Sequence, residues 1–273
     1  MRIDQLLVQR ALASTRSQAQ RLIADGVEWR LGDDWRRVGK NGDEVPPDAE
    51  LRLLNDAQAR YVSRGGLKLE AALQRTGLTA HGLLCLDVGQ STGGFSDCLL
   101  QHGAGMVVGV DVGSAQLHPS LRADPRVLCV EGVNARGLTL ADLEQAWDES
   151  MGADGAFEGD VGTDDYRARF AAGFDLIVAD LSFISQTLVL PALRPLLKAS
   201  GSLLTLVKPQ FELQPGQVGK GGIVRDAAMY PVVEQRLRTA CADLGLTVMD
   251  WFDSPIEGGD GNREFFIHAR PAG

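Results

Sequence analysis

The sequence is poor in cysteine and histidine and has no long apolar segment, and each shortage excludes a class of protein. Its four cysteines are far apart and form no C-x-x-C pair, so the spacing predicts neither a disulfide framework nor a zinc site. The longest apolar runs, such as residues 203–207, are far shorter than the roughly 18 residues that a membrane-spanning helix needs. The first residues lack the apolar core of a signal peptide. We therefore expect a soluble, cytoplasmic protein with no metal site and no membrane partner.

The overall composition is typical of a folded protein, but the charge is unevenly distributed. The 273 residues are 44% hydrophobic and 23% charged, with a net charge of −9, and this length suits one large domain plus a small one. Residues 1–80 hold 13 Lys and Arg against 11 Asp and Glu, whereas the rest of the chain holds 14 against 25. Much of the acidic excess lies in residues 142–165. The N-terminal part is therefore the better candidate for binding a polyanion.

Residues 1–56 have the pattern of a small α+β module, and residues 57–62 are the expected linker. Apolar residues at helical spacing predict two short helices within residues 2–25, and Gly26 is the expected end of the second helix. Short strand-like segments follow at 27–31, 35–38 and 51–54. One face of the second helix presents Arg16, Ser17, Gln20 and Arg21. This face suits phosphate binding, although an ordinary solvated helix face has the same composition.

Residues 63–273 alternate between strand-like and helical patterns. Continuous apolar strands are expected at 83–88, 106–110, 127–130, 176–179 and 203–207, followed by two late strands at 246–251 and 264–269. Helices are expected at 67–76, 95–102, 188–198 and 229–244, whereas the Gly- and Asp-rich residues 151–173 suggest a surface insertion or mobile loop. This alternation is typical of an α/β domain whose parallel sheet is covered by helices on both faces.

A glycine-rich turn follows the first strand of this domain, with the sequence DVGQSTGGF at residues 87–95. Such a turn lets the backbone approach a ligand at the N-terminus of the next helix. Ser91 interrupts a G-x-G-x-x-G fingerprint and no G-K-[ST] follows the turn, so nicotinamide and nucleoside triphosphate sites are disfavoured. A small adenosyl ligand with a sulfonium group fits better, with Asp111 near its ribose and Glu131 near its adenine. A purely structural turn is the alternative.

Charged residues stand at the ends of several predicted strands. Asp180 and Lys208 follow two apolar strands, and Glu264 begins the last strand. If that strand is antiparallel to its neighbours, all three meet at one edge of the sheet, and Lys68 on the preceding helix closes the cluster. A lysine becomes a general base only when its surroundings lower its pKa from about 10.4 towards roughly 7–8, which a second lysine can do. From spacing alone, structural ion pairs are the more common explanation.

Several segments resemble the TlyA (hemolysin-A-like) rRNA 2′-O-methyltransferases, a family within the FtsJ-like S-adenosylmethionine enzymes. The segments are YVSRGGLKLEAAL at 61–73, DVGQSTGGFSDC at 87–98, NAR at 134–136, DLSFIS at 180–185, VKPQFE at 207–212, VGKGGIVRD at 218–226 and SPIEGGDGNREF at 254–265. The N-terminal module resembles the small RNA-binding domain named after ribosomal protein S-four. The resemblance implies a Rossmann-like methyltransferase sheet whose last strand is antiparallel. It also implies methylation of a ribose 2′-hydroxyl, typically of cytidine, in ribosomal RNA.

The resemblance further implies which residues act. It gives a catalytic tetrad of Lys68, Asp180, Lys208 and Glu264, with Lys208 as the base. For S-adenosyl-L-methionine as cofactor, the resemblance implies binding by Gly89, Gly93, Gly94, Phe95 and Asp111. With the residues of the turn and the strand ends, the full expected set adds Asp87, Ser91, Glu131 and Asn134. The expected RNA contacts are Arg2, Arg16, Ser17, Gln20, Arg21, Arg64 and Lys220. We expect ribosomal RNA in ribosomal subunits as the partner, no DNA, and a monomer.

Some residues depart from the family pattern, and other functions stay open. Gln90 stands where the family usually has alanine, and its side chain would either crowd the cofactor entrance or add a contact. Trp29 and Trp35 could stack on bases, but filling the core of the small module is the more common role. The main alternative function is a ribosome-assembly factor that binds RNA and has a non-catalytic cofactor site. A hemolysin ranks last, because a pore-forming protein needs membrane-competent segments.

Overall fold

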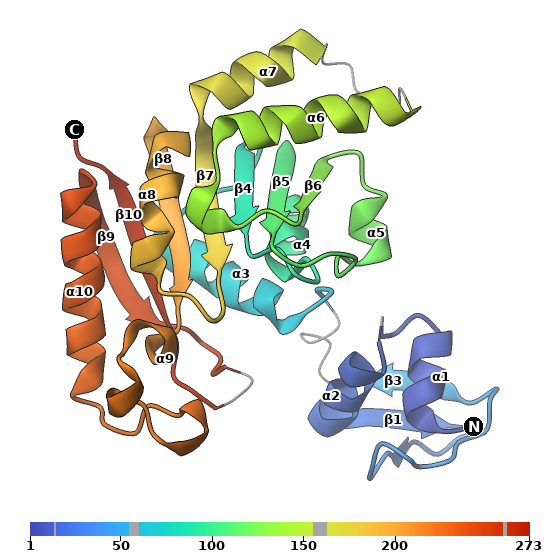
Figure 1. Ribbon diagram of the computed structural model, residues 1–273. Coiled ribbons are helices and arrows are strands. Elements are labelled where there is room, and N and C mark those ends of the chain that lie inside the picture. The colour runs from blue at the N-terminus through green and yellow to red at the C-terminus, as the bar shows by residue number, and fades with distance from the viewer. Residues whose placement is uncertain (14, 55–59, 155–162, 259–260) are drawn as a thin grey trace. The chain divides into compact units, whose positions relative to one another are not determined.

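The structure is a computed structural model that describes residues 1–13, 15–54, 60–154, 163–258 and 261–273 (Figure 1). The chain forms two compact units, Met1–Leu67 and Lys68–Gly273, and the division falls inside helix α3 (Arg64–Thr76). Residues 57–59 of the expected linker lie outside the described residues. Each unit has a hydrophobic core of its own.

The smaller unit packs two helices against a three-stranded antiparallel sheet. Helix α1 (Ile3–Gln9) and helix α2 (Arg16–Gly26) precede strands β1 (Val27–Arg30), β2 (Arg36–Arg37) and β3 (Glu50–Leu53), in the sheet order β2-β1-β3. The Thr15 side chain caps α2 by accepting a hydrogen bond of 3.1 Å from the backbone N–H of Gln18. Gly26 ends the helix at a φ of 122°, which glycine adopts without a steric penalty. The predicted helices and strands are confirmed, with strand ends shifted by one residue.

The larger unit contains a seven-stranded sheet in the order β6-β5-β4-β7-β8-β10-β9. Its strands are β4 (Leu84–Val88), β5 (Met106–Asp111), β6 (Val127–Glu131), β7 (Phe174–Asp180), β8 (Leu197–Val207), β9 (Leu246–Asp253) and β10 (Phe265–Pro271). Strands β4 to β8 pair in parallel, whereas β10 pairs antiparallel with both β8 and β9. The expected antiparallel last strand is therefore confirmed. Its first residue consequently lies at the edge where β7 and β8 end.

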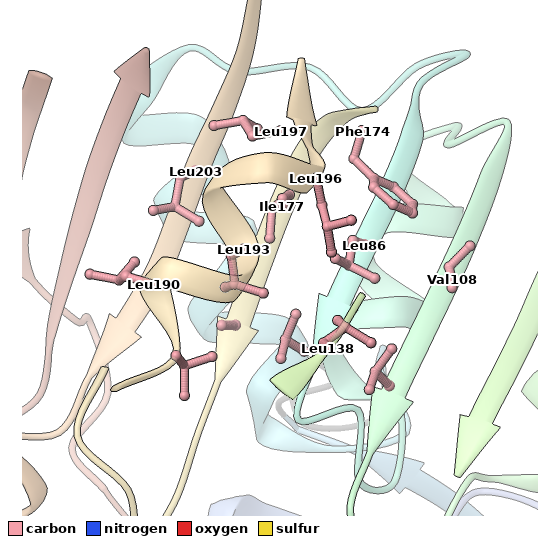
Figure 2. Close-up of a cluster of buried hydrophobic side chains, with 14 of the residues drawn as sticks. Leu86, Val108, Leu138, Phe174, Ile177, Leu190, Leu193, Leu196, Leu197 and Leu203 are labelled. Carbon is pink, nitrogen blue, oxygen red and sulfur yellow. The ribbon is translucent and has the colours of Figure 1, made fainter. Parts of the chain in front are cut away.

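Helices cover both faces of this sheet (Figure 1). The larger helices are α3, α4 (Gly94–Gln101), α6 (Leu140–Asp154), α7 (Thr163–Ala172) and α10 (Met229–Asp243), and single turns form α5 (Pro119–Arg122), α8 (Leu190–Leu193) and α9 (Pro209–Glu212). Figure 2 shows the core under α8, where buried leucines from this helix lie against apolar side chains of the central strands. Burial on both faces explains why these strands read as continuous apolar runs. None of the described helices is long and apolar enough to cross a membrane.

Two sequence predictions for this unit are wrong. The single helix expected at 188–198 is divided into a 3-10 turn, α8 and a second 3-10 turn, and β8 already begins at Leu197. Pro191 and Pro195 explain the interruption, because neither has a backbone N–H to donate. The loop expected at 151–173 includes the end of α6 and all of α7, while residues 155–162 lie outside the described residues. Trp147 and Phe170 join these two helices edge-to-face, with ring centroids 5.7 Å apart.

Candidate active site

Four charged side chains meet at the carboxyl edge of the central strands. Asp180 is the last residue of β7, Lys208 directly follows β8, and Glu264 directly precedes β10. The Nζ of Lys208 lies 2.5 Å from Oδ1 of Asp180. Lys68 reaches the same edge from α3 and forms an ion pair with Glu264. The structure therefore brings together the four residues that the sequence analysis combined, while their catalytic roles stay a prediction.

The two ion pairs differ in their exposure to solvent. The side chains of Lys68 and Glu264 are only 8% and 3% exposed, whereas that of Asp180 is 25% exposed. Burial raises the pKa of Glu264, and the attraction and hydrogen bond of Lys68 oppose that shift. Lys208 also attracts the Glu264 carboxylate, and Asp180 repels it. The four charges therefore form one electrostatic cluster, with a buried half and a half that opens towards solvent.

A cavity of about 560 Å³ adjoins this cluster and contains part of the glycine-rich turn. Asp180 belongs to its wall, so the cavity connects the charged cluster to the turn after β4. The expected cofactor residues that line it are Gly89, Ser91, Asp111 and Asn134. Lining residues that the sequence analysis did not select are Val110, Val112, Gln116, Val133, Ala135, Leu181, Ser182, Phe183 and Ile184. Their common signal was their position at the end of a predicted strand or within six residues after it.

The turn after β4 approaches the end of β7 closely. Gly89 has a φ of 83°, and a Cβ atom at this position would lie 2.6 Å from the backbone oxygen of Asp180. Only glycine fits both the conformation and the distance. The Asp111 carboxylate fixes the other side of the turn by accepting hydrogen bonds of 2.7 Å from the N–H groups of Ser91 and Gly113. Each oxygen of Asp111 retains a further lone pair for a ligand hydroxyl.

Other expected cofactor residues are not among those that line the described cavity. Asp87 is fully buried and accepts a hydrogen bond of 2.7 Å from Ser96, and burial raises its pKa to about 7. Gly93 and Gly94 form the start of α4, and Phe95 packs on Phe266. These residues shape the turn from inside the protein. Direct contact between Asp87 and a ligand does not fit this geometry.

Glu131 is also turned away from the cavity. Its carboxylate accepts a hydrogen bond of 2.6 Å from Arg122 and lines a separate pocket beside α6. The residues that follow it in the chain, Val133 and Asn134, reach the cavity instead. The expected place of Glu131 beside the adenine is therefore not supported.

The expected RNA contacts are distributed over both units. Arg2, Arg16, Ser17 and Gln20 are exposed and Arg21 is partly exposed in the smaller unit. Arg64 is partly exposed at the start of α3, and Lys220 is exposed in a 3-10 turn of the larger unit. These exposures leave the residues available for phosphate contacts, which stay a prediction.

The two tryptophans of the smaller unit have different surroundings. Trp29 packs against the core, as expected, and the Arg36 guanidinium lies 5.5 Å from its ring centroid. Trp35 is not part of that core, and the guanidiniums of Arg30 and Arg52 lie over its ring at 4.9 and 4.3 Å. The interpretation as a core residue is therefore wrong for Trp35.

Gln90 is buried and does not line the described cavity, so its position fits neither a crowded entrance nor an added contact. Its side chain is buried, and its Nε2 donates a hydrogen bond of 2.7 Å to Ser96, which in turn donates to Asp87. The amide lies against Gly109 of β5, where an added Cβ atom would come within 1.9–2.3 Å of it. Gln90 therefore occupies a space that exists only because residue 109 is glycine.

This packing predicts a stability defect that a second substitution repairs. Gly109→Ala should lower the free energy of unfolding by about 1–3 kcal/mol, because the new methyl overlaps the buried amide. Gln90→Ala in the same chain should recover most of that loss. Gly137→Ala is the control, since nothing lies within 4 Å of a Cβ at that position. Denaturant unfolding of these variants, of Gln90→Ala alone and of the unchanged chain measures these differences. Equal effects of Gly109→Ala with and without Gln90 would contradict the account.

A second set of hydrogen bonds braces the segment that follows Asp180. Glu212 at the end of α9 is buried, and its carboxylate accepts hydrogen bonds of 2.5 Å from the Ser185 hydroxyl and 2.7 Å from the Gln186 N–H. Lys208 donates a hydrogen bond of 2.9 Å to Ser182 in the same segment. Phe183 between them has a φ of 64° and is 90% exposed. The loops after β7 and β8 are thus held together around the charged cluster.

Comparisons with known proteins agree with this architecture. Residues 61–271 match the FtsJ-like methyltransferase family, and residues 1–26 match the S4 domain. The chain is 39% identical to the 16S/23S rRNA (cytidine-2′-O)-methyltransferase TlyA of Mycobacterium tuberculosis, over 98% of this chain and 89% of that protein. It is 32% identical to Hemolysin A of Brachyspira hyodysenteriae, over 98% and 99% of the two chains.

A solved structure is similar over the whole chain. It belongs to a Streptococcus thermophilus protein described as a candidate hemolysin, with 36% identity and a TM-score of 0.70 over 100% of this chain and 88% of that one. The family resemblance inferred from the sequence motifs is confirmed by these matches. The chain belongs to the FtsJ-like methyltransferase family and carries an N-terminal S4 domain.

Proposed function

We propose that this chain transfers the methyl group of S-adenosyl-L-methionine to the 2′-hydroxyl of a cytidine ribose in ribosomal RNA. The observation that carries the proposal is the shared wall between the charged cluster and the cavity. Asp180 ion-pairs with Lys208 and also lines the cavity beside Gly89 and Asp111. A proton acceptor and a cofactor site thus adjoin one another. The name of the M. tuberculosis relative supports the choice of cytidine and of ribosomal RNA.

The cavity residues fit an adenosyl ligand. Asp111 has free lone pairs for ribose hydroxyls, and the valine side chains of Val110, Val112 and Val133 offer apolar surface for a planar base. The glycine conformation at Gly89 brings the backbone close to whatever occupies the cavity. When bound, the sulfonium supplies a methyl group that is already activated for transfer.

The residues of the cluster then have separate tasks. Neutral Lys208 accepts the proton of the 2′-hydroxyl, which makes the oxygen a better nucleophile. Asp180 and Ser182 orient the Lys208 amine through their contacts of 2.5 and 2.9 Å. Lys68 and Glu264 contribute a buried pair of opposite charges to the same cluster. Holding the Lys208 amine and the ribose 2′-hydroxyl in place supplies a large part of the acceleration of methyl transfer.

The smaller unit is proposed to hold the ribosomal RNA. Its exposed basic residues suit phosphate contacts, and such contacts position a protein without reading sequence. The 2′-hydroxyl itself lets the enzyme distinguish RNA from DNA. We expect the reaction to take place in the cytoplasm on ribosomal subunits, with the protein acting as a monomer. We also propose that no metal takes part in the chemistry.

Methyl transfer from tritiated S-adenosylmethionine to purified ribosomal subunits tests the proposal. We expect label in the ribosomal RNA and, after alkaline digestion, label in a dinucleotide that resists cleavage, because a methylated 2′-oxygen cannot attack the adjacent phosphate. The Lys208→Ala chain is the matched control and should incorporate label about 10²–10⁴-fold more slowly. Tight binding to subunits without any label would favour the non-catalytic assembly factor.

A further inference from the structure

The smaller unit contains a carboxylate that is covered by two arginines. Asp4, in the first turn of α1, has no solvent-exposed side-chain surface. Arg2 donates hydrogen bonds of 3.0 Å from Nε and Nη2 to the two carboxylate oxygens, and Arg16 at the start of α2 donates one of 2.9 Å to Oδ2. The Arg2 and Arg16 side chains are nevertheless 44% and 55% exposed.

This arrangement fixes the direction of both guanidiniums. A guanidinium has five N–H donors in a rigid plane, and only two from Arg2 and one from Arg16 bind Asp4. The side chains that carry the remaining donors are about half exposed to solvent. The hydrogen bonds of Arg2 and, to a smaller extent, the hydrogen bond of Arg16 hold the pKa of Asp4 well below its usual range. Asp4 therefore keeps its charge at neutral pH and keeps both arginines in place.

Asp4 also offsets the repulsion between the two arginines. Nη2 of Arg2 and Nη2 of Arg16 both lie within 3.0 Å of the same oxygen, Oδ2 of Asp4. Two guanidiniums held this close to one carboxylate form a fixed group of donors with a net positive charge on partly exposed side chains. Phosphodiester oxygens accept such forked donors readily.

We propose that Asp4 is a positioning residue that holds Arg2 and Arg16 as one clamp for a backbone phosphate of the bound ribosomal RNA. The inference rests on the proposed function, which gives the smaller unit its RNA. An ion pair that only joins α1 to α2 is the competing explanation. The two explanations differ in sign, because Asp4→Asn removes a negative charge and should strengthen binding to RNA if position does not matter.

The two explanations are distinguished by equilibrium binding of the full chain to purified ribosomal subunits. The affinity is measured over a series of salt concentrations at fixed magnesium. Arg2→Gln with Arg16→Gln should weaken binding by about 10- to 100-fold and lower the salt slope by about 1, the value for one lost phosphate contact. Asp4→Asn should weaken binding by about five- to tenfold despite its added positive charge. In the chain that lacks both arginines, Asp4→Asn should have no further effect.

Matched controls keep each outcome informative. Asp34 is exposed on the same unit, so Asp34→Asn makes the same charge change and should leave binding unchanged or slightly tighter. The double variant Arg2→Lys with Arg16→Lys retains both positive charges but lacks the planar guanidinium. It replaces Asp4→Asn as the test if thermal unfolding shows that Asp4→Asn does not fold. The lysine chain should bind nearly as weakly as the glutamine chain.

A folded Asp4→Asn chain that binds as tightly as the original would overturn the inference. Full affinity of the lysine chain, or of the glutamine chain, would also overturn it. None of these binding results depends on methyl transfer. The proposed reaction is tested separately, because its failure would appear as absence of label in the tritium assay.

Discussion

Lys208→Ala is expected to lower the rate of methyl transfer by about 10²–10⁴-fold, the usual cost of losing a general base. The affinity for S-adenosylmethionine should change little. The Lys208 amine contacts Asp180 and Ser182, and Lys208 is not among the residues found to line the described cavity. Single-turnover rates and equilibrium binding of the cofactor measure the two effects separately.

Lys208→Arg distinguishes a base from a cation that binds phosphate. A guanidinium stays charged at any working pH and cannot accept a proton, so this chain should be almost as slow as Lys208→Ala. A phosphate contact would instead be kept. Lys198, at the start of the same strand, pairs with Asp175 at 2.7 Å, and Lys198→Arg is the matched control that should keep normal activity. Near-normal methylation by Lys208→Arg would make the base assignment wrong.

The position of the charged cluster was predictable because it depends on strand order and strand ends. Asp180 and Lys208 follow continuous apolar runs that the alternating pattern indicates to be buried strands, and strand ends of a parallel sheet share one edge. Glu264 required one further condition, an antiparallel last strand, which the structure satisfies. The pairing of Lys68 with Glu264 spans 196 residues. The helix position of Lys68 and the family resemblance both placed Lys68 in the cluster, but neither identified Glu264 as its partner.

The direction of individual side chains was not predictable from local sequence. Asp87 and Glu131 stand in the strand positions where a ligand contact was expected, yet Ser96 and Arg122 hold their carboxylates elsewhere. The inward turn of Gln90 depends on the missing side chain at Gly109, on a neighbouring part of the sheet. The direction of each of these side chains is decided by the residue that it contacts in the folded protein. A single sequence does not show which residues come into contact.

The broken helix at 188–198 is a different kind of error, because the signal was present. Pro191 and Pro195 both interrupt the apolar pattern, and each removes a backbone donor. Helix α7 was missed for the opposite reason. Its sequence has little amphipathic periodicity, and its place depends on the contact of Phe170 with Trp147. Tertiary packing outweighs local pattern there.

Lys68→Met is expected to cause the largest loss of stability in the larger unit. It leaves the Glu264 carboxylate, which is 3% exposed, without its ion-pair partner. Removing one member of a buried pair typically costs about 3–5 kcal/mol, whereas removing a member of an exposed pair costs less than about 1 kcal/mol. Arg126→Ala is the exposed control, since Arg126 pairs with Asp124 at the surface. Denaturant unfolding measures both changes.

The loss should depend on pH in a way that identifies its cause. Burial already raises the pKa of Glu264, and Lys68 opposes that shift, so removing Lys68 raises this pKa further. A raised carboxyl pKa favours the folded state at low pH, where the group is protonated, and this contribution is lost as pH rises through the folded-state pKa. The defect of Lys68→Met should therefore be smaller at pH 5 than at pH 8. A defect of the same size at both pH values would mean that lost packing, and not the buried charge, is responsible.

A double substitution separates the structural part of this pair from its part in the reaction. Lys68→Met combined with Glu264→Gln removes both charges, and replacing a buried ion pair by neutral groups of similar size is often close to neutral for stability. We expect the double variant to unfold near the denaturant concentration of the unchanged chain. Its methyl transfer should stay low, because the opposite charges behind Lys208 are absent. If activity returns together with stability, the pair serves the fold alone, and the catalytic cluster reduces to Asp180 and Lys208.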